Sequence, residues 1–134
     1  EDGIEYKEYT AADTNEIQSV TTQAVSECDA IYIPTDNTMA NNTAQINDIC
    51  LPAGVPVIAG EEGICSGCGI ATLSISYYDI GYRAGEMAYE VLVNGADIST
   101  MEIETAPEVT KMYNPTICEE LGIEIPEGYE AIEE

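Results

Sequence analysis

Short apolar runs alternate along this chain with segments whose apolar residues recur every three or four positions. Ala30–Pro34, Val55–Ala59 and Ala71–Ile75 are rich in apolar and β-branched residues and too short for helices, which predicts three buried strands. Helical periodicity predicts one helix from about Thr38 to Cys50 and another from Asp79 to Val93. Strands that alternate with helices in this way predict an α/β domain with a mainly parallel sheet covered by helices.

The predicted helices have recognisable ends. Asp13 and Glu16 form a capping box, which predicts a helix running to about Glu27. Leu51–Gly54 should stop the helix that starts near Thr38, and Asn94-Gly95 should end the one that starts at Asp79. This last helix has the clearest apolar stripe, formed by Ile80, Ala84, Met87, Ala88, Val91 and Leu92.

The remaining segments give weaker patterns. Alternation of apolar and polar residues at Ile4–Tyr9 predicts a strand, and Glu108–Tyr113 reads as the last strand. A glycine-rich loop is expected between Gly63 and the strand at Ala71. Thr116–Leu121 is predicted to be a short helix ended by Gly122, and the tail from Glu124 onward to be an acidic surface loop.

Composition narrows the range of partners. The 134 residues are enough for one domain, and 26 acidic residues against three basic ones give a net charge of −23. Such a surface repels phosphate groups, so neither nucleic acid nor an anionic membrane surface is an expected partner. The longest apolar runs cover only a few residues, so the sequence predicts no membrane-spanning helix.

Five cysteines form an odd set that cannot pair completely. Cys65-Ser-Gly-Cys68 has the spacing of a redox motif or of half a zinc site, but it can equally hold incidental thiols or a local disulfide. The chain has no histidine, and no basic residue neighbours the motif. We therefore expect that this motif is not catalytic and that the chain has no metal site.

The sequence gives little support for an enzyme. No histidine is available as a general base, and neither a Gly-x-Ser-x-Gly elbow nor a phosphate-binding loop is present. Pairs of carboxylates are plentiful, but in so acidic a chain they carry no information. We predict no catalytic residues and no cofactor.

Polar residues follow two of the predicted strands where each strand ends. Thr35, Asp36, Asn37 and Thr38 come directly after one strand and begin a helix, and they could bind polar groups of a ligand or simply cap that helix. Glu61 and Glu62 follow the next strand, where an acid could pair with a ligand ammonium group or be ordinary acidic surface. Carboxyl ends of parallel strands share one edge, so a binding cleft is expected there.

Three segments together resemble one known family. Asp29–Ala40, with the sequence Asp-Ala-Ile-Tyr-Ile-Pro-Thr-Asp-Asn-Thr-Met-Ala, is similar to a second-lobe strand and helix of ABC-transporter substrate-binding proteins. Val55–Gly63 and Ala71–Gly81 resemble the following strand ends, and Gly122–Pro126 fits as well. The similarity covers nearly all of the chain, and the nearest group includes members that bind tryptophan or tyrosine.

The resemblance implies a fold and a function. It implies an incomplete flavodoxin-like, three-layer lobe of a type I periplasmic-binding protein, in which residues 1–134 form part of the C-terminal ligand-binding lobe. Residues 77–100 would then cross to a first lobe and pack on it. Ser76, Tyr77 and Tyr78 would lie at this crossing, where a tyrosine could stack on an aromatic ligand or only pack in a hinge.

The same resemblance implies an extracytoplasmic component of an ABC importer, as a periplasmic protein or a cell-surface lipoprotein. Its partners would be a small molecule, for which the resemblance indicates the class of aromatic amino acids, and the permease subunits. An exposed helical stripe would favour self-association of this fragment. The alternatives are a ligand-sensing regulatory domain of flavodoxin-like fold and, more weakly, a redox protein that uses the two cysteines.

Overall fold

The computed structural model describes residues 3–106 and 108–132, and it contains a five-stranded sheet. The strands lie in the order β1 (Ile31–Ile33), β2 (Val57–Ala59), β3 (Ala71–Ser74), β4 (Thr110–Tyr113) and β5 (Glu130–Ala131). β1, β2 and β3 are parallel neighbours, β4 is antiparallel to β3, and β5 is parallel to β4. The predicted α/β class with a mainly parallel sheet is therefore confirmed.

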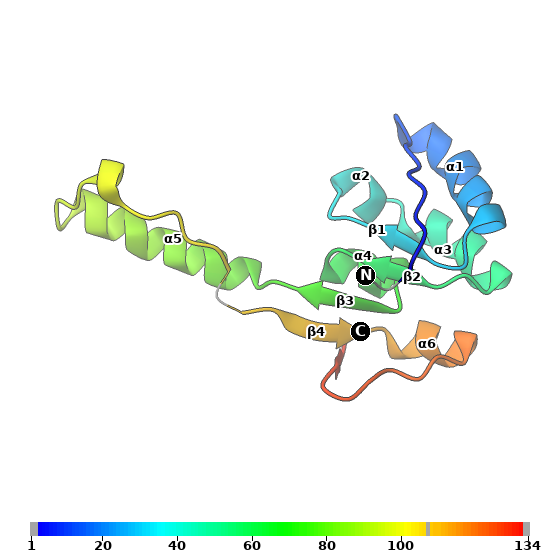
Figure 1. The fold of residues 1–134 in the computed structure, drawn as a ribbon. Coiled ribbons are helices and arrows are strands. Elements are labelled where there is room, and N and C mark those ends of the chain that lie inside the picture. The colour runs from blue at the N-terminus through cyan, green and yellow to red at the C-terminus, as the bar shows by residue number, and fades with distance from the viewer. Residues whose placement is uncertain (1–2, 107, 133–134) are drawn as a thin grey trace.

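Helices separate the strands along the chain (Figure 1). They are α1 (Thr14–Glu27), α2 (Asn37–Ala40), α3 (Thr43–Ala53), α4 (Glu62–Cys68), α5 (Tyr77–Leu92) and α6 (Pro115–Leu121), with a short 3₁₀ helix η1 at Ile98–Thr100. Within the described part of the chain, no helix has both the length and the hydrophobicity needed to cross a bilayer.

Two of the predicted helix boundaries are confirmed, because local hydrogen bonds determine them. The Asp13 carboxylate accepts a hydrogen bond from the Asn15 N–H at 2.8 Å, and Glu16 accepts one from the Ala12 N–H at 2.9 Å. At the other end of the chain, Gly122 ends α6 with a φ of 66°, a left-handed conformation that favours glycine.

The main core lies between β1 and β2 on one side and α1, α3 and α4 on the other. Ile17, Ile46 and Ile64 are almost completely buried in it, together with Val57 from β2. A smaller second core joins α6 to the start of β3, with Leu51 of α3 packed against it; its buried residues are Ile70, Ala71, Ile117 and Cys118. This burial of apolar surface is the main source of stability for the folded unit.

The opposite face of β1–β3 is largely open, which corrects the expectation that these strands are buried throughout. Tyr32, Ile58 and Leu73 are 65%, 39% and 57% exposed. Strand register places all three on one face, because Tyr32 pairs with Ile58, and Ile58 pairs with Ala71, two residues before Leu73. Ala71, which shares this face, is buried in the second core beside Ile117 and Cys118 of α6.

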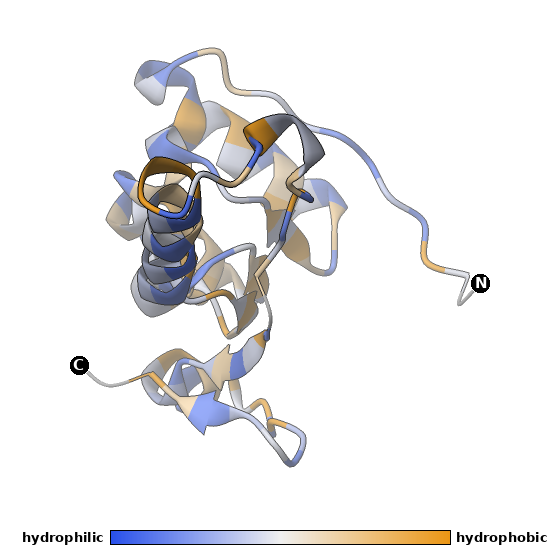
Figure 2. Ribbon diagram, turned by 90° about the vertical axis from the view of Figure 1, so that its left-hand side faces the viewer, coloured by the Kyte–Doolittle hydropathy of each residue, from blue (hydrophilic) through white to orange (hydrophobic). Residues whose placement is uncertain are grey.

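The predicted strand at Ile4–Tyr9 is wrong. This segment is an irregular chain that runs away from the helices (Figure 2), and Ile4 and Tyr6 are more than 80% exposed. A strand needs a neighbour for its N–H and C=O groups, and no described strand lies beside this segment. Side chains hold the C-terminal end of this segment to α1, since Lys7 and Tyr9 both donate to the Glu27 carboxylate.

The single helix predicted from Thr38 to Cys50 is in fact two, α2 and α3. Asn42 interrupts it: its side-chain amide donates to the Thr38 carbonyl at 2.7 Å, and the residue itself becomes the N-cap of α3. α3 then continues past Pro52, which lies in the last turn, and ends at Gly54 with a φ of 72°. The predicted stop was therefore too early, because a proline in the last turn costs less than one in the middle.

The expected glycine-rich loop before β3 is mainly the helix α4, which is a further correction. The Glu61 carboxylate accepts hydrogen bonds from the N–H groups of Gly63 and Ile64, which starts the helix. Ile64, Cys65 and Cys68 then share one buried face. Burial of this face outweighs the low helix propensity of the glycines.

The tail after Glu124 is also more ordered than predicted. It contributes β5, which extends the sheet beyond β4, and the Ile132 N–H donates to the Tyr113 carbonyl at 2.9 Å. Ile132 is buried against the main core. A pairing between segments this far apart in sequence has no local signal.

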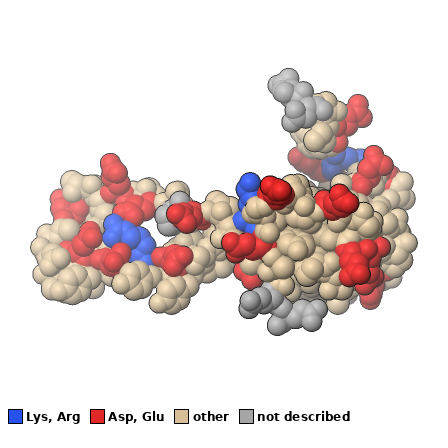
Figure 3. All heavy atoms as spheres, turned by 90° about the horizontal axis from the view of Figure 1, so that it is seen from below, with Lys and Arg blue, Asp and Glu red and all other residues tan. Residues whose placement is uncertain are grey.

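One part of the chain stands apart from both cores. We call residues 77–109 the arm: α5 leads out from β3, and the following segment returns beside it to β4 (Figures 1 and 3). α5 has no buried residue, although its apolar periodicity was the clearest in the sequence. The stripe along α5 therefore remains exposed to solvent in the described structure.

Candidate functional site

The carboxyl ends of β1, β2 and β3 lie at one edge of the sheet, and a helix begins directly after each of them. Asp36, Glu61 and Ser76 are the N-caps of these three helices. The parallel pairing of β1 with β2 and of β2 with β3 brings the three loops side by side. This edge is where open α/β sheets usually bind their ligands.

The first two loops touch each other closely. The Thr35 hydroxyl donates to the Gly60 carbonyl at 3.1 Å, and the Gly60 N–H donates to the Ile33 carbonyl at 2.8 Å. A Cβ added to Gly60 would lie 2.6 Å from the Thr35 nitrogen, so any side chain there would push the two loops apart. The sequence requires glycine at this position for close approach, not for an unusual φ.

The loop after β1 is exposed, and the hydrogen bonds of its side chains are made with backbone groups. Thr35, Asp36, Asn37 and Thr38 are all exposed, and none of them lines the main cavity at this edge. The Asp36 carboxylate accepts a hydrogen bond from the Met39 N–H at 2.9 Å, as an N-cap does. The capping alternative therefore explains the position of Asp36 without a ligand.

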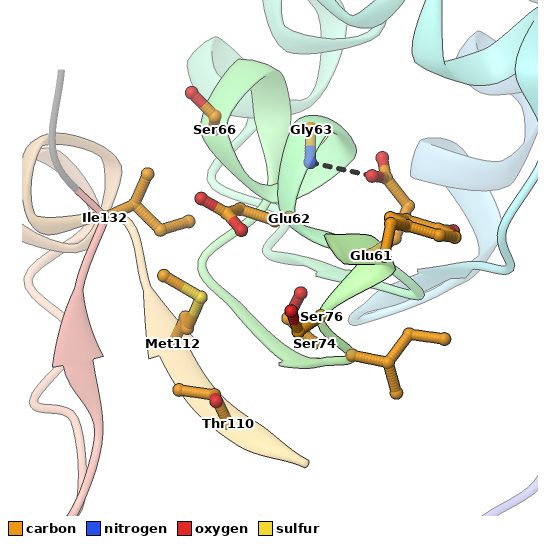
Figure 4. Close-up of a pocket in the computed structure, with 11 residues that line it drawn as sticks. Glu61, Glu62, Gly63, Ser66, Ser74, Ser76, Thr110, Met112 and Ile132 are labelled. Carbon is orange, nitrogen blue, oxygen red and sulfur yellow. Dashed lines mark hydrogen bonds between the residues drawn. The ribbon is translucent and has the colours of Figure 1, made fainter. Parts of the chain in front are cut away.

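The two glutamates after β2 have different surroundings. Both carboxylate oxygens of Glu61 accept hydrogen bonds from backbone N–H groups of α4. Glu62 lies in the first turn of α4, no described residue hydrogen-bonds to its carboxylate, and the side chain points into the cavity (Figure 4). Glu62 is therefore the acid at this edge that is available to a ligand.

The residues after β3 also differ in whether they line the cavity. The Ser76 hydroxyl accepts a hydrogen bond from the Asp79 N–H at 3.1 Å, and both Ser76 and Tyr77 line the cavity. Tyr78 does not line it; it is 78% exposed, and its ring stacks on that of Tyr82 with 6.3 Å between centroids. Of the two tyrosines considered from the sequence, only Tyr77 borders the cavity.

The cavity has a volume of about 640 Å³, within the range of small-molecule sites. Its walls come from the loop after β2, the start of α4, the end of β3, the start of α5, β4 and Ile132 after β5 (Figure 4). The structure thus brings together Glu61, Glu62, Ser76 and Tyr77 from the predicted set. It adds Gly63, Ser66, Ser74, Ile75, Thr110, Met112 and Ile132, which sequence reasoning did not select.

Three of these additions, Thr110, Met112 and Ile132, could not have been found from local patterns. Thr110 pairs with Ser74 because β4 is antiparallel to β3, so the start of β4 lies at the same edge as the end of β3. Ile132 reaches the site only through the pairing of β5 with β4. The places of these residues in the cavity wall depend on strand order, which the sequence does not reveal.

The charge of the cavity is one-sided. Glu61 and Glu62 line it, and no lysine or arginine does. Tyr77, Met112 and Ile132 provide apolar surface beside these acids. This combination favours a ligand that has a cationic group next to an apolar body.

Cys65 and Cys68 lie in surroundings that disfavour the reactive thiolate form needed for redox chemistry. Cys65 and Cys68 are buried in the last turns of α4, and burial raises the pKa of both thiols to about 12. The thiolate, which is the reactive form, is therefore disfavoured at neutral pH. In the described residues, no group of histidine, cysteine and acidic side chains is arranged to hold a metal ion.

Comparison with known proteins gives a consistent result. The family model described as "ABC transporter substrate binding protein" matches residues 1–131. Among curated proteins, a tyrosine-binding protein of Clostridioides difficile is 29% identical over 111 residues, which cover 83% of this chain and 32% of that protein.

Solved structures agree with this match. A ligand-free, open structure of a substrate-binding protein with adhesive properties from Clostridium difficile has 31% identity and a TM-score of 0.77, and the match covers 98% of this chain and 45% of that one. The ABC domain in complex with L-Trp from Streptococcus pneumonia has 29% identity and a TM-score of 0.83, with coverage of 97% and 45%. The chain thus spans less than half the length of these relatives.

Proposed function

The chain belongs to the family of ABC transporter substrate-binding proteins, and we propose that it forms one lobe of a two-lobed protein that binds a small solute for an ABC importer. Closure of two lobes around a ligand is a hinge motion that removes the ligand from water. The observation that carries this proposal is the cavity at the carboxyl ends of β2 and β3, in a lobe similar to one solved in complex with L-Trp. The protein would act outside the cytoplasm and pass its solute to permease subunits.

We propose that residues 77–100 cross to the first lobe and pack on it. The support is the apolar stripe of α5, in which no residue is fully buried, and the position of α5 directly after a strand that borders the cavity. A chain that crosses next to the cavity would connect ligand binding with lobe closure. Binding and delivery require no bond chemistry, so we propose no enzymatic activity.

We propose an amino acid, and specifically an aromatic one, as the ligand. The support is the tyrosine-binding relative and the L-Trp complex, together with the acidic and apolar lining of the cavity. Glu62 would accept hydrogen bonds from the ligand ammonium group, and Tyr77 would contact the aromatic ring. Since no basic side chain lines this cavity, donors for the ligand carboxylate would come from backbone N–H groups or from the facing lobe.

Calorimetry across the amino acids, with the full two-lobed protein, tests this proposal. A hydrogen bond to a charged group contributes about 1.5–3 kcal/mol, so Glu62→Gln should weaken binding roughly tenfold or more. Glu120→Gln is the matched control, because it makes the same charge change at an exposed position of α6. Asp36→Ala should affect binding less than Glu62→Gln, because Asp36 caps α2 outside the cavity.

Two different failures can be distinguished. If no amino acid binds to the full protein, the ligand class is wrong. If an amino acid binds but the affinity is indifferent to Glu62→Gln and to Tyr77→Ala, the ligand class survives and the assignment of the site is wrong.

A further inference from the structure

The arm contains a single basic residue, Arg83, in a stretch that also carries seven acidic ones. The Arg83 guanidinium donates to both oxygens of Glu104, from Nε at 2.7 Å and from Nη2 at 2.6 Å. Its Nη1 contacts Glu86 at 3.3 Å and Glu90 at 3.5 Å. Figure 3 shows this basic group in the arm surrounded by acidic ones.

The pair with Glu104 differs from the other two in what it joins. Glu86 and Glu90 belong to α5, the same helix as Arg83, whereas Glu104 belongs to the segment that returns toward β4. Among the described residues, the hydrogen bonds between α5 and residues 97–106 are these two from Arg83 to Glu104. The bidentate geometry fixes both the separation and the relative orientation of the two segments.

Apolar packing holds the returning segment only weakly, since Met101 is half-buried and no residue of the segment is fully buried. Ile98 and Ile103 are 72% and 96% exposed, and α5 has no buried residue. A segment with so little burial would normally open easily from the helix beside it. The position of the returning segment relative to α5 therefore depends more on the Arg83–Glu104 pair than on apolar burial.

The two segments that this pair joins border the ligand cavity at their other ends. Tyr77, six residues before Arg83, begins α5, and Thr110, six residues after Glu104, begins β4; both line the cavity. We infer that Arg83 is a positioning residue: by binding Glu104 it holds the outgoing and returning segments of the arm together and so keeps Tyr77 and Thr110 in their places in the cavity wall. The part of this inference that concerns the cavity rests on the proposed function, whereas the joining of the two segments does not.

The charges that face the Arg83–Glu104 pair determine the pH range over which the pair stabilises the arm. Hydrogen bonds from Arg83 lower the pKa of the Glu104 carboxyl, and the Arg83 guanidinium also faces Glu86 and Glu90 of α5. A carboxylate with a lowered pKa contributes its stabilisation fully above the ordinary glutamate pKa of about 4.5. The contribution is lost as the pH falls through the lowered value.

Hydrogen exchange measured by mass spectrometry on the whole chain tests the inference without a ligand. Glu104→Gln and Arg83→Gln should each raise the exchange rate of the hydrogen-bonded amides in residues 97–106, those of Ser99, Thr100 and Met101, about two- to fivefold at neutral pH. Arg83→Lys should not restore protection, because an ammonium group cannot make the bidentate contact. The charge exchange Arg83→Glu with Glu104→Arg should restore much of it, since this double variant rebuilds the pair.

Glu86→Gln is the matched control, with the same charge change next to the same guanidinium, and should leave exchange in residues 97–106 close to that of the original chain. Equal effects of Glu86→Gln and Glu104→Gln would overturn the inference, because they would show a general charge effect. Unchanged exchange in both Arg83→Gln and Glu104→Gln would overturn it as well. Faster exchange near Tyr77 and Thr110 in Glu104→Gln supports the positioning role, and exchange confined to residues 97–106 would refute that part alone. Failure of amino-acid binding in calorimetry would refute the proposed function and leave the exchange result standing.

Discussion

The core unit around α4 and the arm around α5 use similar sequence patterns with opposite outcomes. Both helices have apolar residues at helical spacing, yet Ile64 in α4 is completely buried whereas Leu92 in α5 is 82% exposed. α4 has only seven residues and two glycines, and α5 has sixteen residues and the clearest amphipathic pattern. Periodicity therefore identifies a helix face that can be buried, but it does not say against what.

The difference has a physical origin in what surrounds each helix. α4 lies against β2, β3 and α3, so its short apolar face meets apolar partners from three directions. α5 leaves the sheet and, among the described residues, is joined to the segment that returns beside it by the charges of Arg83 and Glu104, with no fully buried apolar residue. The core unit is thus held by burial and the arm by polar contacts, and substitutions should separate these two modes.

The largest difference is expected for truncation of matched apolar residues. Ile64→Ala should lower the free energy of unfolding by about 2–5 kcal/mol, because it leaves a cavity in a close-packed core. Leu92→Ala removes a side chain of the same size from the arm and should change it by no more than about 0.5 kcal/mol. Urea unfolding followed by circular dichroism measures both. A comparable loss in the two variants would show that α5 is packed against a partner surface in solution.

A glycine-to-alanine pair should give effects of opposite sign. A Cβ at Gly67 of α4 would overlap the Thr43 side chain, so Gly67→Ala should destabilise the core unit by about 1–3 kcal/mol despite the better helix propensity. A Cβ at Gly85 of α5 meets nothing within 4 Å, so Gly85→Ala should stabilise that helix by about 0.5–1 kcal/mol. Urea unfolding of the first variant and exchange rates in α5 for the second measure these effects. Destabilisation of α5 by Gly85→Ala would indicate that the arm is packed closely at that position.

Alkaline pH should weaken the core unit and leave the arm unchanged. Burial raises the pKa of Cys65 and Cys68 to about 12 and that of Cys50 to about 11, against 9.0 for an unperturbed thiol. Because the folded pKa is raised, the stabilisation is complete below pH 9 and is lost as the pH rises toward these values. Between pH 8 and 9.5 each buried thiol should cost about 0.5–1 kcal/mol of unfolding free energy.

Urea unfolding in the presence of a reductant at the two pH values measures this loss. Cys68→Ala should remove one share of it, and Cys28→Ser is the control, because Cys28 is only half-buried. Exchange in the arm, corrected for intrinsic rates, should not follow the pH change. The same pH dependence in Cys68→Ala and in the original chain would contradict the assignment to buried thiols.

The weakest interaction is expected for self-association of two chains through the arm. The exposed residues Ile80, Leu92 and Val93 offer apolar surface to a second copy, whereas the net charge of −23 opposes contact. Sedimentation at micromolar concentration should therefore show a mass above 14.4 kDa that increases with salt. A monomer at all salt concentrations, with protected amides along α5, would show that the stripe folds back onto its own sheet.

Several features of the molecule could be predicted from the sequence because neighbouring residues determine them. The cap at Asp13 and the end of α6 at Gly122 depend on hydrogen bonds and φ angles within one turn. The three adjacent parallel strands and the edge with Glu62 also followed, since short apolar runs between helices leave few alternative topologies, whereas Tyr77 was indicated by the family resemblance. The family resemblance was likewise contained in these segments and is confirmed.

Other features were decided only by contacts between distant segments. Ile4–Tyr9 has a strand pattern but no strand beside it, and α4 forms in spite of its glycines because its buried face packs on the core. Thr110 and Ile132 reach the cavity through the order of β3, β4 and β5, which no local pattern encodes. Local hydrogen bonds and side-chain periodicity are written along the chain, whereas burial and strand pairing depend on what each face meets after folding. The sequence therefore determined most of the elements, and tertiary packing determined which of their faces are covered and which side chains share the cavity.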